Sequence, residues 1–301
     1  MILINHWYAI QPEPYIETLG NKLQLIKNFD MRCIFCKKDS SKSKSIEHII
    51  PESLGNTRYT LPQGVVCDNC NNYFSRKIEG KMLELPYFKS LRFRQDIKTK
   101  RRISPQGTGL VSTPGCEIKV QVQNSDRELV VHVNKKADFE KISNTIPGTL
   151  YVPIYDFPER DNQIISRFLG KVGLEELSSK FLSISEEALN EALIDNTQFD
   201  LLRSFVRYGK PDNDWPYYLR RIYSEDKLFQ VDGGNCQKVH EEHLLLTEAG
   251  ELYVVVCILG IEYTLNLIGP ELDGYENWLK EHHNKSPLDE NIVKKDRSTK
   301  F

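Results

Sequence analysis

The chain has 301 residues, of which 40% are hydrophobic and 27% are charged, and its formal net charge is −2. This balance is typical of a soluble globular protein, and the length favours a small module followed by one larger domain. The sequence lacks an apolar run near the roughly 20 residues of a membrane-spanning helix, and residues 1–10 lack the basic start of a signal peptide. We therefore expect no membrane segment and a cytoplasmic protein.

Residues 1–30 predict an N-terminal extension with a short strand, an irregular stretch that contains proline, and a helix over residues 20–29. The next segment is marked by two Cys-x-x-Cys pairs, formed by Cys33, Cys36, Cys67 and Cys70. Such pairs are typical of a metal site rather than of a secreted disulfide scaffold, and four thiolates suit one structural tetrahedral zinc ion. We expect Cys116, Cys236 and Cys257, which stand alone, to be small buried hydrophobic residues.

The sequence between the two cysteine pairs predicts a polar loop over residues 39–45 and a strand over residues 46–50 that carries Glu47 and His48. Residues 51–64 form a long connection with turn residues. A helix is expected to begin around residues 67–71 and to place Phe74, Ile78 and Met82 on one apolar face, because they are four residues apart.

The charge is distributed unevenly along the chain. Residues 1–102 contain 18 Lys and Arg against 10 Asp and Glu, a net of +8, whereas the rest of the chain has a net of −10. A basic segment directly after the cysteine pairs, interleaved with aromatic residues, favours contacts with a polyphosphate backbone over the alternative of a solvated helix face or linker. The residues that we assign to nucleic-acid binding are Arg76, Lys77, Lys81, Arg92, Arg94, Lys98, Lys100, Arg101 and Arg102.

The larger remainder, residues 103–284, predicts a mixed α+β domain. Alternating residues 116–122 and the apolar run 129–133 indicate a hairpin, and residues 252–259 and 261–268 indicate a second one around Gly260. Helices are expected over three apolar stretches between the hairpins, at residues 164–172, 188–194 and 199–206. We interpret residues 239–243 and the pair His282–His283 as solvated surface, and residues 285–301 as a flexible tail.

The pair Glu47–His48 suits phosphodiester hydrolysis. A histidine with a free ring nitrogen can take a proton from water near neutral pH, and a hard divalent cation takes carboxylate and amide oxygens while keeping several waters. Neighbouring residues on a strand point to opposite faces, so Glu47 and His48 can share one site only where the chain twists or bulges.

The order Cys-x-x-Cys, Glu-His-Ile-Ile-Pro and Cys-x-x-Cys-Asn resembles the HNH endonuclease family in its variant with two zinc knuckles. The resemblance implies a small zinc-stapled ββα-metal module at the start of an α+β protein. It implies that His48 is the general base, that Glu47 and Asn71 hold a catalytic Mg²⁺ or Mn²⁺, and that the four cysteines hold the zinc. With its basic extension, the module would span residues 31–102.

Two details of this assignment stay open in the sequence. Asn72 is an alternative to Asn71 as the second ligand if the helix begins one residue later. Asn56 and Gln63 are both candidates for the family's middle Asn, which orients the base through a backbone contact.

We therefore predict a metal-dependent endonuclease that acts on DNA, with RNA as an alternative substrate. A non-catalytic zinc adaptor for nucleic acid or protein is the competing hypothesis. The acidic remainder has no motif of its own, so a sensor or a surface for a regulatory partner or ligand is our hypothesis for it. By analogy, a bacterial restriction or phage-defence setting is expected.

Overall fold

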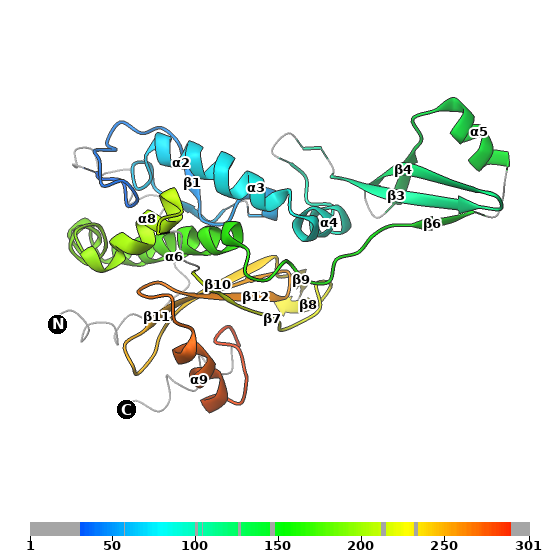
Figure 1. Ribbon diagram of the computed structural model, residues 1–301. Coiled ribbons are helices and arrows are strands. Elements are labelled where there is room, and N and C mark those ends of the chain that lie inside the picture. Colours follow the sequence, from blue (N-terminus) through cyan, green and yellow to red (C-terminus); the bar gives the residue numbers. More distant parts are fainter. Residues whose placement is uncertain are drawn as a thin grey trace.

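The computed structural model describes residues 31–289 except 57, 100–101, 104, 126–127, 145–147, 212–214 and 232–233. The elements predicted for residues 1–30 and most of the predicted tail lie outside these ranges. The predicted α+β class is confirmed: a cysteine-clustered module at the N-terminal side is followed by a larger part of sheets and helices (Figure 1).

The module is a short hairpin followed by a helix. β1 (Glu47–His48) pairs antiparallel with β2 (Thr60–Leu61), and the 3-10 turn η3 (Glu52–Leu54) lies between them. The helix consists of α2 (Asp68–Phe74), the π-helical segment η4 (Ser75–Glu79) and α3 (Gly80–Leu83). Its predicted apolar face is confirmed, because Phe74, Ile78 and Met82 are completely buried. The strand is shorter than the predicted 46–50 because Ile49 and Ile50 turn into the core.

The helix α4 (Pro86–Arg94) is followed by a projecting β-sheet, residues 106–151, which we call the arm. The arm is a four-stranded antiparallel sheet in the order β5-β4-β3-β6, and it confirms the first predicted hairpin. Figure 1 shows the sheet and its helix α5 extending away from the body of the protein. The bounds are β3 (Gln106–Thr113), β4 (Cys116–Ser125), β5 (Glu128–His132), α5 (Lys136–Asn144) and β6 (Thr149–Tyr151).

The predicted helical block is confirmed and is dominated by one long helix, α6 (Gln163–Ile184). Asn162 caps its first turn, because its side-chain oxygen accepts from the backbone N–H of Ile164 at 2.9 Å. The shorter helices that follow are α7 (Glu186–Leu189), the π-helical η5 (Asn190–Ile194), the 3-10 turn η6 (Thr197–Phe199) and α8 (Asp200–Tyr208).

The C-terminal part contains a second antiparallel sheet in the order β10-β11-β12-β7, with the predicted hairpin β11–β12 at its centre. The strands of this sheet are β7 (Tyr218–Arg221), β10 (His240–Leu246), β11 (Leu252–Ile258) and β12 (Ile261–Asn266). A separate small hairpin is formed by β8 (Leu228–Val231) and β9 (Gly234–Gln237), and the last helix is α9 (Asp273–Glu281). Among the described helices, none is long and apolar enough to cross a membrane.

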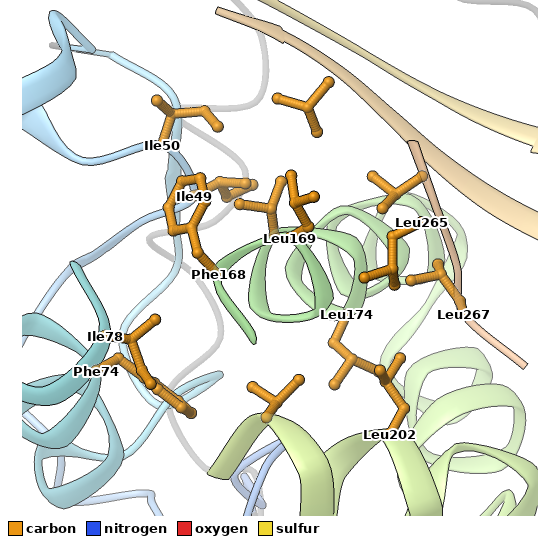
Figure 2. Close-up of a cluster of buried hydrophobic side chains, with 14 of the residues drawn as sticks. Ile49, Ile50, Phe74, Ile78, Phe168, Leu169, Leu174, Leu202, Leu265 and Leu267 are labelled. Carbon is orange, nitrogen blue, oxygen red and sulfur yellow. The ribbon is translucent and has the colours of Figure 1, made fainter. Parts of the chain in front are cut away.

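The elements stack in layers with α6 at the centre. The module and α8 pack on one side of α6, and the sheet β10-β11-β12-β7 packs on its other side. Helix α9 covers the opposite face of that sheet (Figure 1). Figure 2 shows Phe168 and Leu169 of α6 between Ile49 of the module and Leu265 of β12. The hydrophobic core is therefore continuous across residue 102, where the sequence predicts a domain boundary.

Two expectations about individual residues are wrong. Residues 240–246 form a strand, β10, that pairs with β11 along its whole length, so His240 and His243 are partly buried rather than solvated. Of the three single cysteines, Cys257 is completely buried, whereas Cys116 is half-buried and Cys236 is exposed on the small hairpin β8–β9.

Candidate active site and zinc centre

The four cysteines of the two knuckles converge on one point. Their Sγ atoms all lie within 4.8 Å of one another, and the Sγ atoms of Cys36 and Cys67 are 3.7 Å apart. A tetrahedral zinc ion with Zn–S bonds of about 2.3 Å places its sulfurs about 3.8 Å apart, so the thiols fit a closed structural site. A hydrogen bond between the Cys33 and Cys70 sulfurs lowers the pKa of Cys33 to about 5 and raises the pKa of Cys70.

β1 presents the Glu–His pair on two different faces. Glu47 lies opposite Leu61 and His48 opposite Thr60 in the pairing with β2. Glu47 is 5% exposed and faces the interior, whereas His48 is partly exposed. The alternation that the sequence predicts for a strand is therefore present, and β1 places the histidine towards solvent while it places the carboxylate beneath the strand.

A lysine from α6 lies beneath β1. Lys171 is completely buried, and its Nζ is 2.8 Å from Glu47 Oε1, 2.9 Å from Glu79 Oε1 and 2.9 Å from Glu175 Oε2. The same Nζ lies 3.2 Å from the carbonyl oxygen of His48 and 3.5 Å from that of Ile49. One ammonium group thus joins the β1 strand, the π-helical segment η4 and α6.

The charged groups in this buried cluster strongly shift one another's pKa values. Burial alone would lower the pKa of Lys171, but attraction to Glu175, Glu47 and Glu79 outweighs burial and holds this pKa well above its ordinary value. Burial raises the pKa of Glu175 well above its ordinary value, and repulsion by Glu47 and Glu79 adds to that rise. Lys171 is therefore held as a positive charge among the three acids, while burial disfavours the ionised form of Glu175.

Asn56 holds the loop between β1 and β2. It is 2% exposed, its Nδ2 donates to the carbonyl oxygens of Ile50 at 2.6 Å and Tyr59 at 2.8 Å, and its Oδ1 accepts from the backbone N–H of Tyr59 at 2.8 Å. The preceding Gly55 has φ = 91°, and a Cβ there would lie 2.7 Å from Val239 Cγ1, so the turn requires glycine. Gln63, the other candidate, is bonded on the surface to the carbonyl oxygen of Lys44 at 3.0 Å.

Asn71 lies beside the start of β1. It is in the first turns of α2 and donates through Nδ2 to the carbonyl oxygen of Ile46 at 3.4 Å, one residue before Glu47. Asn72, the alternative ligand, is exposed on the same helix.

The residues that the resemblance assigns to a catalytic cation fit it in donor type. Glu47 and Asn71 offer a carboxylate and an amide oxygen, the donors that Mg²⁺ prefers, and they flank the same end of β1. Lys171 contacts Glu47 Oε1, and Glu47 Oε2 is buried as well, so both carboxylate oxygens lie beneath β1. Within the described ranges, the four knuckle cysteines form the one group of three or more Cys, His, Asp or Glu side chains close enough to share an ion.

The basic residues of the predicted nucleic-acid surface divide into two groups. Arg76, Lys77 and Lys81 are exposed along the helix that follows the second knuckle, and Lys98 and Arg102 are also exposed. Arg92 is 8% exposed, and Arg94 makes two hydrogen bonds of 2.8 Å to the carboxylate of Glu225, so the first is buried and the second is paired within the protein. Lys100 and Arg101 lie outside the described residues.

The sequence interpretation did not include Lys171, Glu79 or Glu175. A signal for two of them exists: Lys171 and Glu175 are four residues apart in a helix whose other positions from 168 to 177 are apolar, glycine or Glu176. Charged residues inside such a run are expected to be paired within the core rather than solvated. The strand that Lys171 contacts is set by the packing of α6 against the module. No local sequence pattern predicts that packing.

Comparison with protein families shows that residues 33–84 match the HNH endonuclease family. Comparisons with curated proteins and with solved structures gave no significant match. The matched segment runs from the first knuckle through β1, β2 and the second knuckle to the end of α3, and its four cysteines form the clustered site described above. Residues 33–84 are therefore an HNH endonuclease domain.

Proposed function

We propose that this protein is a metal-dependent endonuclease that hydrolyses phosphodiester bonds in DNA, with His48 as the general base. The observation that carries the proposal is the family match over residues 33–84 together with the partly exposed His48 beside the buried Glu47 on β1. A thiolate zinc site suits a reducing compartment, so we place the protein in the cytoplasm, and restriction or phage defence is the setting that we propose by analogy.

His48 performs the first proton transfer in the proposed reaction. Its ring nitrogen accepts a proton from a water molecule, the water oxygen forms a bond to phosphorus, and the bond from phosphorus to the 3′ oxygen breaks in line. The departing 3′ oxygen takes a proton from solvent and His48 releases its proton to solvent, so the products carry a 5′-phosphate and a 3′-hydroxyl group. Asn56 keeps the loop after β1 in place through its bonds to Ile50 and Tyr59, and we assign to it the role of the middle Asn.

Glu47 and Asn71 are the residues that we propose for the catalytic Mg²⁺ or Mn²⁺. Bound there, a divalent cation would supply positive charge next to the scissile phosphate and the departing oxygen. The exposed Arg76, Lys77 and Lys81 lie on the helix that begins at the second knuckle, and we propose that they hold flanking phosphates. We leave Arg92 and Arg94 out of this surface because Arg92 is buried and Arg94 is paired with Glu225.

The proposal predicts metal-dependent cleavage that needs His48. Supercoiled plasmid is incubated with the zinc-loaded full chain in Mg²⁺, in Mn²⁺ and in EDTA, beside His48→Ala. A matched control is His132→Ala, which removes an exposed histidine on the distant arm strand β5. We expect nicking or linearisation with divalent metal, a loss of about 10²- to 10⁴-fold in His48→Ala, and no change in His132→Ala.

Cleavage by His48→Ala at the wild-type rate would contradict the proposed mechanism. DNA binding without cleavage by the folded wild-type protein would instead favour a zinc-dependent adaptor. Replacing the plasmid by a single-stranded RNA and a DNA of the same sequence distinguishes the two substrate classes.

A further inference from the structure

Lys171, which lies outside the HNH endonuclease domain, contacts both the side chain of Glu47 and the backbone carbonyl of His48. It belongs to α6, more than eighty residues after the end of the domain at residue 84. We propose that Lys171 is a positioning residue for the nuclease site: it fixes the β1 strand and holds the Glu47 carboxylate in the orientation that receives the divalent cation. This inference rests on the proposed function, because it assigns Lys171 a role in that same site.

The contacts of Lys171 concentrate on the residues around the proposed base. Three of its five described contacts are made with consecutive residues, namely the Glu47 carboxylate and the carbonyl oxygens of His48 and Ile49. A lysine that only neutralised buried acids would have no reason to bind two successive backbone carbonyls of the catalytic strand. The short two-residue pairing of β1 with β2 provides little support by itself, so an anchor beneath the strand is needed.

The helix that carries Lys171 is rigidly placed. Gly170 and Gly173 lie on either side of it, and a Cβ on Gly173 would lie 2.3 Å from Leu267 Cδ2. The helix therefore packs closely against its neighbours on both sides of Lys171, which fixes the backbone that carries the side chain, and the three ion pairs hold the ammonium. A group fixed in this way can orient a metal ligand, in the manner of the outer partners that hold the ligands of metal sites.

The three acids around Lys171 differ in what they can do. Glu175 and Lys171 have side chains with no exposed surface, and Glu79 has 11% exposed. Glu47, with a side chain 6% exposed, belongs to the strand that carries His48. We infer that Glu79 and Glu175 keep the ammonium in place, whereas Glu47 is the group that the ammonium directs.

The test compares Lys171→Met with Lys180→Met. Lys180 is an exposed lysine on the same helix, so its variant controls for loss of a positive charge from α6. Because Lys171→Met leaves three acids in the interior, a double variant, Lys171→Met with Glu175→Gln, removes the cation together with the acid that pairs with it on the same helix. Zinc content and circular dichroism check that each protein is folded.

Two measurements report on position rather than on activity alone. The first is amide hydrogen exchange of residues 46–50, and the second is the affinity for Mn²⁺ measured by electron paramagnetic resonance on zinc-loaded protein. In Lys171→Met and in the double variant we expect exchange at least about tenfold faster and Mn²⁺ affinity about 10- to 100-fold weaker, with cleavage reduced in parallel. Lys180→Met is expected to stay within about twofold of wild type in all three.

A purely structural role predicts a different pattern. If Lys171 only balances buried charge, the double variant regains wild-type exchange and Mn²⁺ affinity once it is folded, and that result overturns the proposal. Wild-type values in Lys171→Met overturn it as well. A failure of the proposed function has a different sign: wild-type protein and His48→Ala then cleave equally, or neither cleaves. In that case the amide hydrogen exchange of residues 46–50 still decides the role of Lys171.

Discussion

Glu176, on α6, is a carboxylic acid that stays protonated at neutral pH. It is 1% exposed and accepts a hydrogen bond from the hydroxyl of Tyr59 at 2.7 Å, at the contact between the β1–β2 loop and β10. Burial, together with repulsion by Glu242, raises the pKa of Glu176 from 4.5 to about 8. His243, whose pKa burial lowers, and Lys180 lie at the same contact.

This shift gives the stability of the protein a defined pH dependence. Between pH 4.5 and about 8 the folded protein keeps a proton on Glu176 that the unfolded chain has lost, so the free energy of unfolding falls as the pH rises through this window. Glu176→Gln is always neutral, so its stability should lack this fall and exceed that of wild type at pH 8 by an amount on the order of 3 kcal/mol. Urea unfolding at pH 5, 6.5 and 8 measures the difference.

The exposed Glu248→Gln on the turn after β10 serves as the control and should follow wild type at each pH. If the free energy of unfolding changes with pH in the same way for Glu176→Gln and wild type, Glu176 is ionised in the folded protein. The same result would remove the assignment of a protonated acid to the contact between the module and β10.

At the level of elements, the close packing of α6 predicts an unusual response to alanine. Replacing a glycine inside an exposed helix by alanine normally stabilises it by about 0.5–1 kcal/mol. At Gly173 the new Cβ would lie 2.3 Å from Leu267 Cδ2 and 3.1 Å from Val254 Cγ1, both in the completely buried core. We expect Gly173→Ala to destabilise the protein by about 1–3 kcal/mol, because overpacking outweighs the gain in helix propensity.

Chemical unfolding of Gly173→Ala, with zinc present throughout, measures this difference. Gly115→Ala is a useful comparison, because Gly115 has φ = 80° with no atom within 4 Å of the added Cβ, so any loss there reflects backbone strain alone. Stabilisation by Gly173→Ala would contradict the packing of α6 against β11 and β12.

Elements with a clear local signal were predictable. The apolar residues Phe74, Ile78 and Met82 recur at helical spacing and all lie in the core, and both predicted hairpins form because alternating apolar runs flank turn residues. β10 was missed because His240–Glu241–Glu242–His243 is entirely polar, and it forms a strand only because the neighbouring β11 offers backbone partners along its length. Propensity was overridden there by tertiary context.

At the level of the whole molecule, the nuclease module and the C-terminal part share one core. Arg203 of α8 donates to the carbonyl oxygen of Ile34, in the first knuckle, at 2.7 Å, and Lys171 of α6 holds Glu47. The spacing of the cysteines was enough to predict the four-cysteine cluster, because its members lie within a short stretch of chain. The support beneath β1 was not predictable, because Lys171 and Glu47 are brought together only by the long-range packing of α6.

Chemical rescue is the most direct test of His48 as the general base. His48→Gly leaves a space at the ring position, and single-turnover cleavage of plasmid by the full chain is measured in Mg²⁺ with increasing concentrations of imidazole. We predict that His48→Gly is inactive without imidazole and regains cleavage in proportion to the concentration of neutral imidazole. Cleavage by His48→Gly at the wild-type rate without imidazole would contradict it.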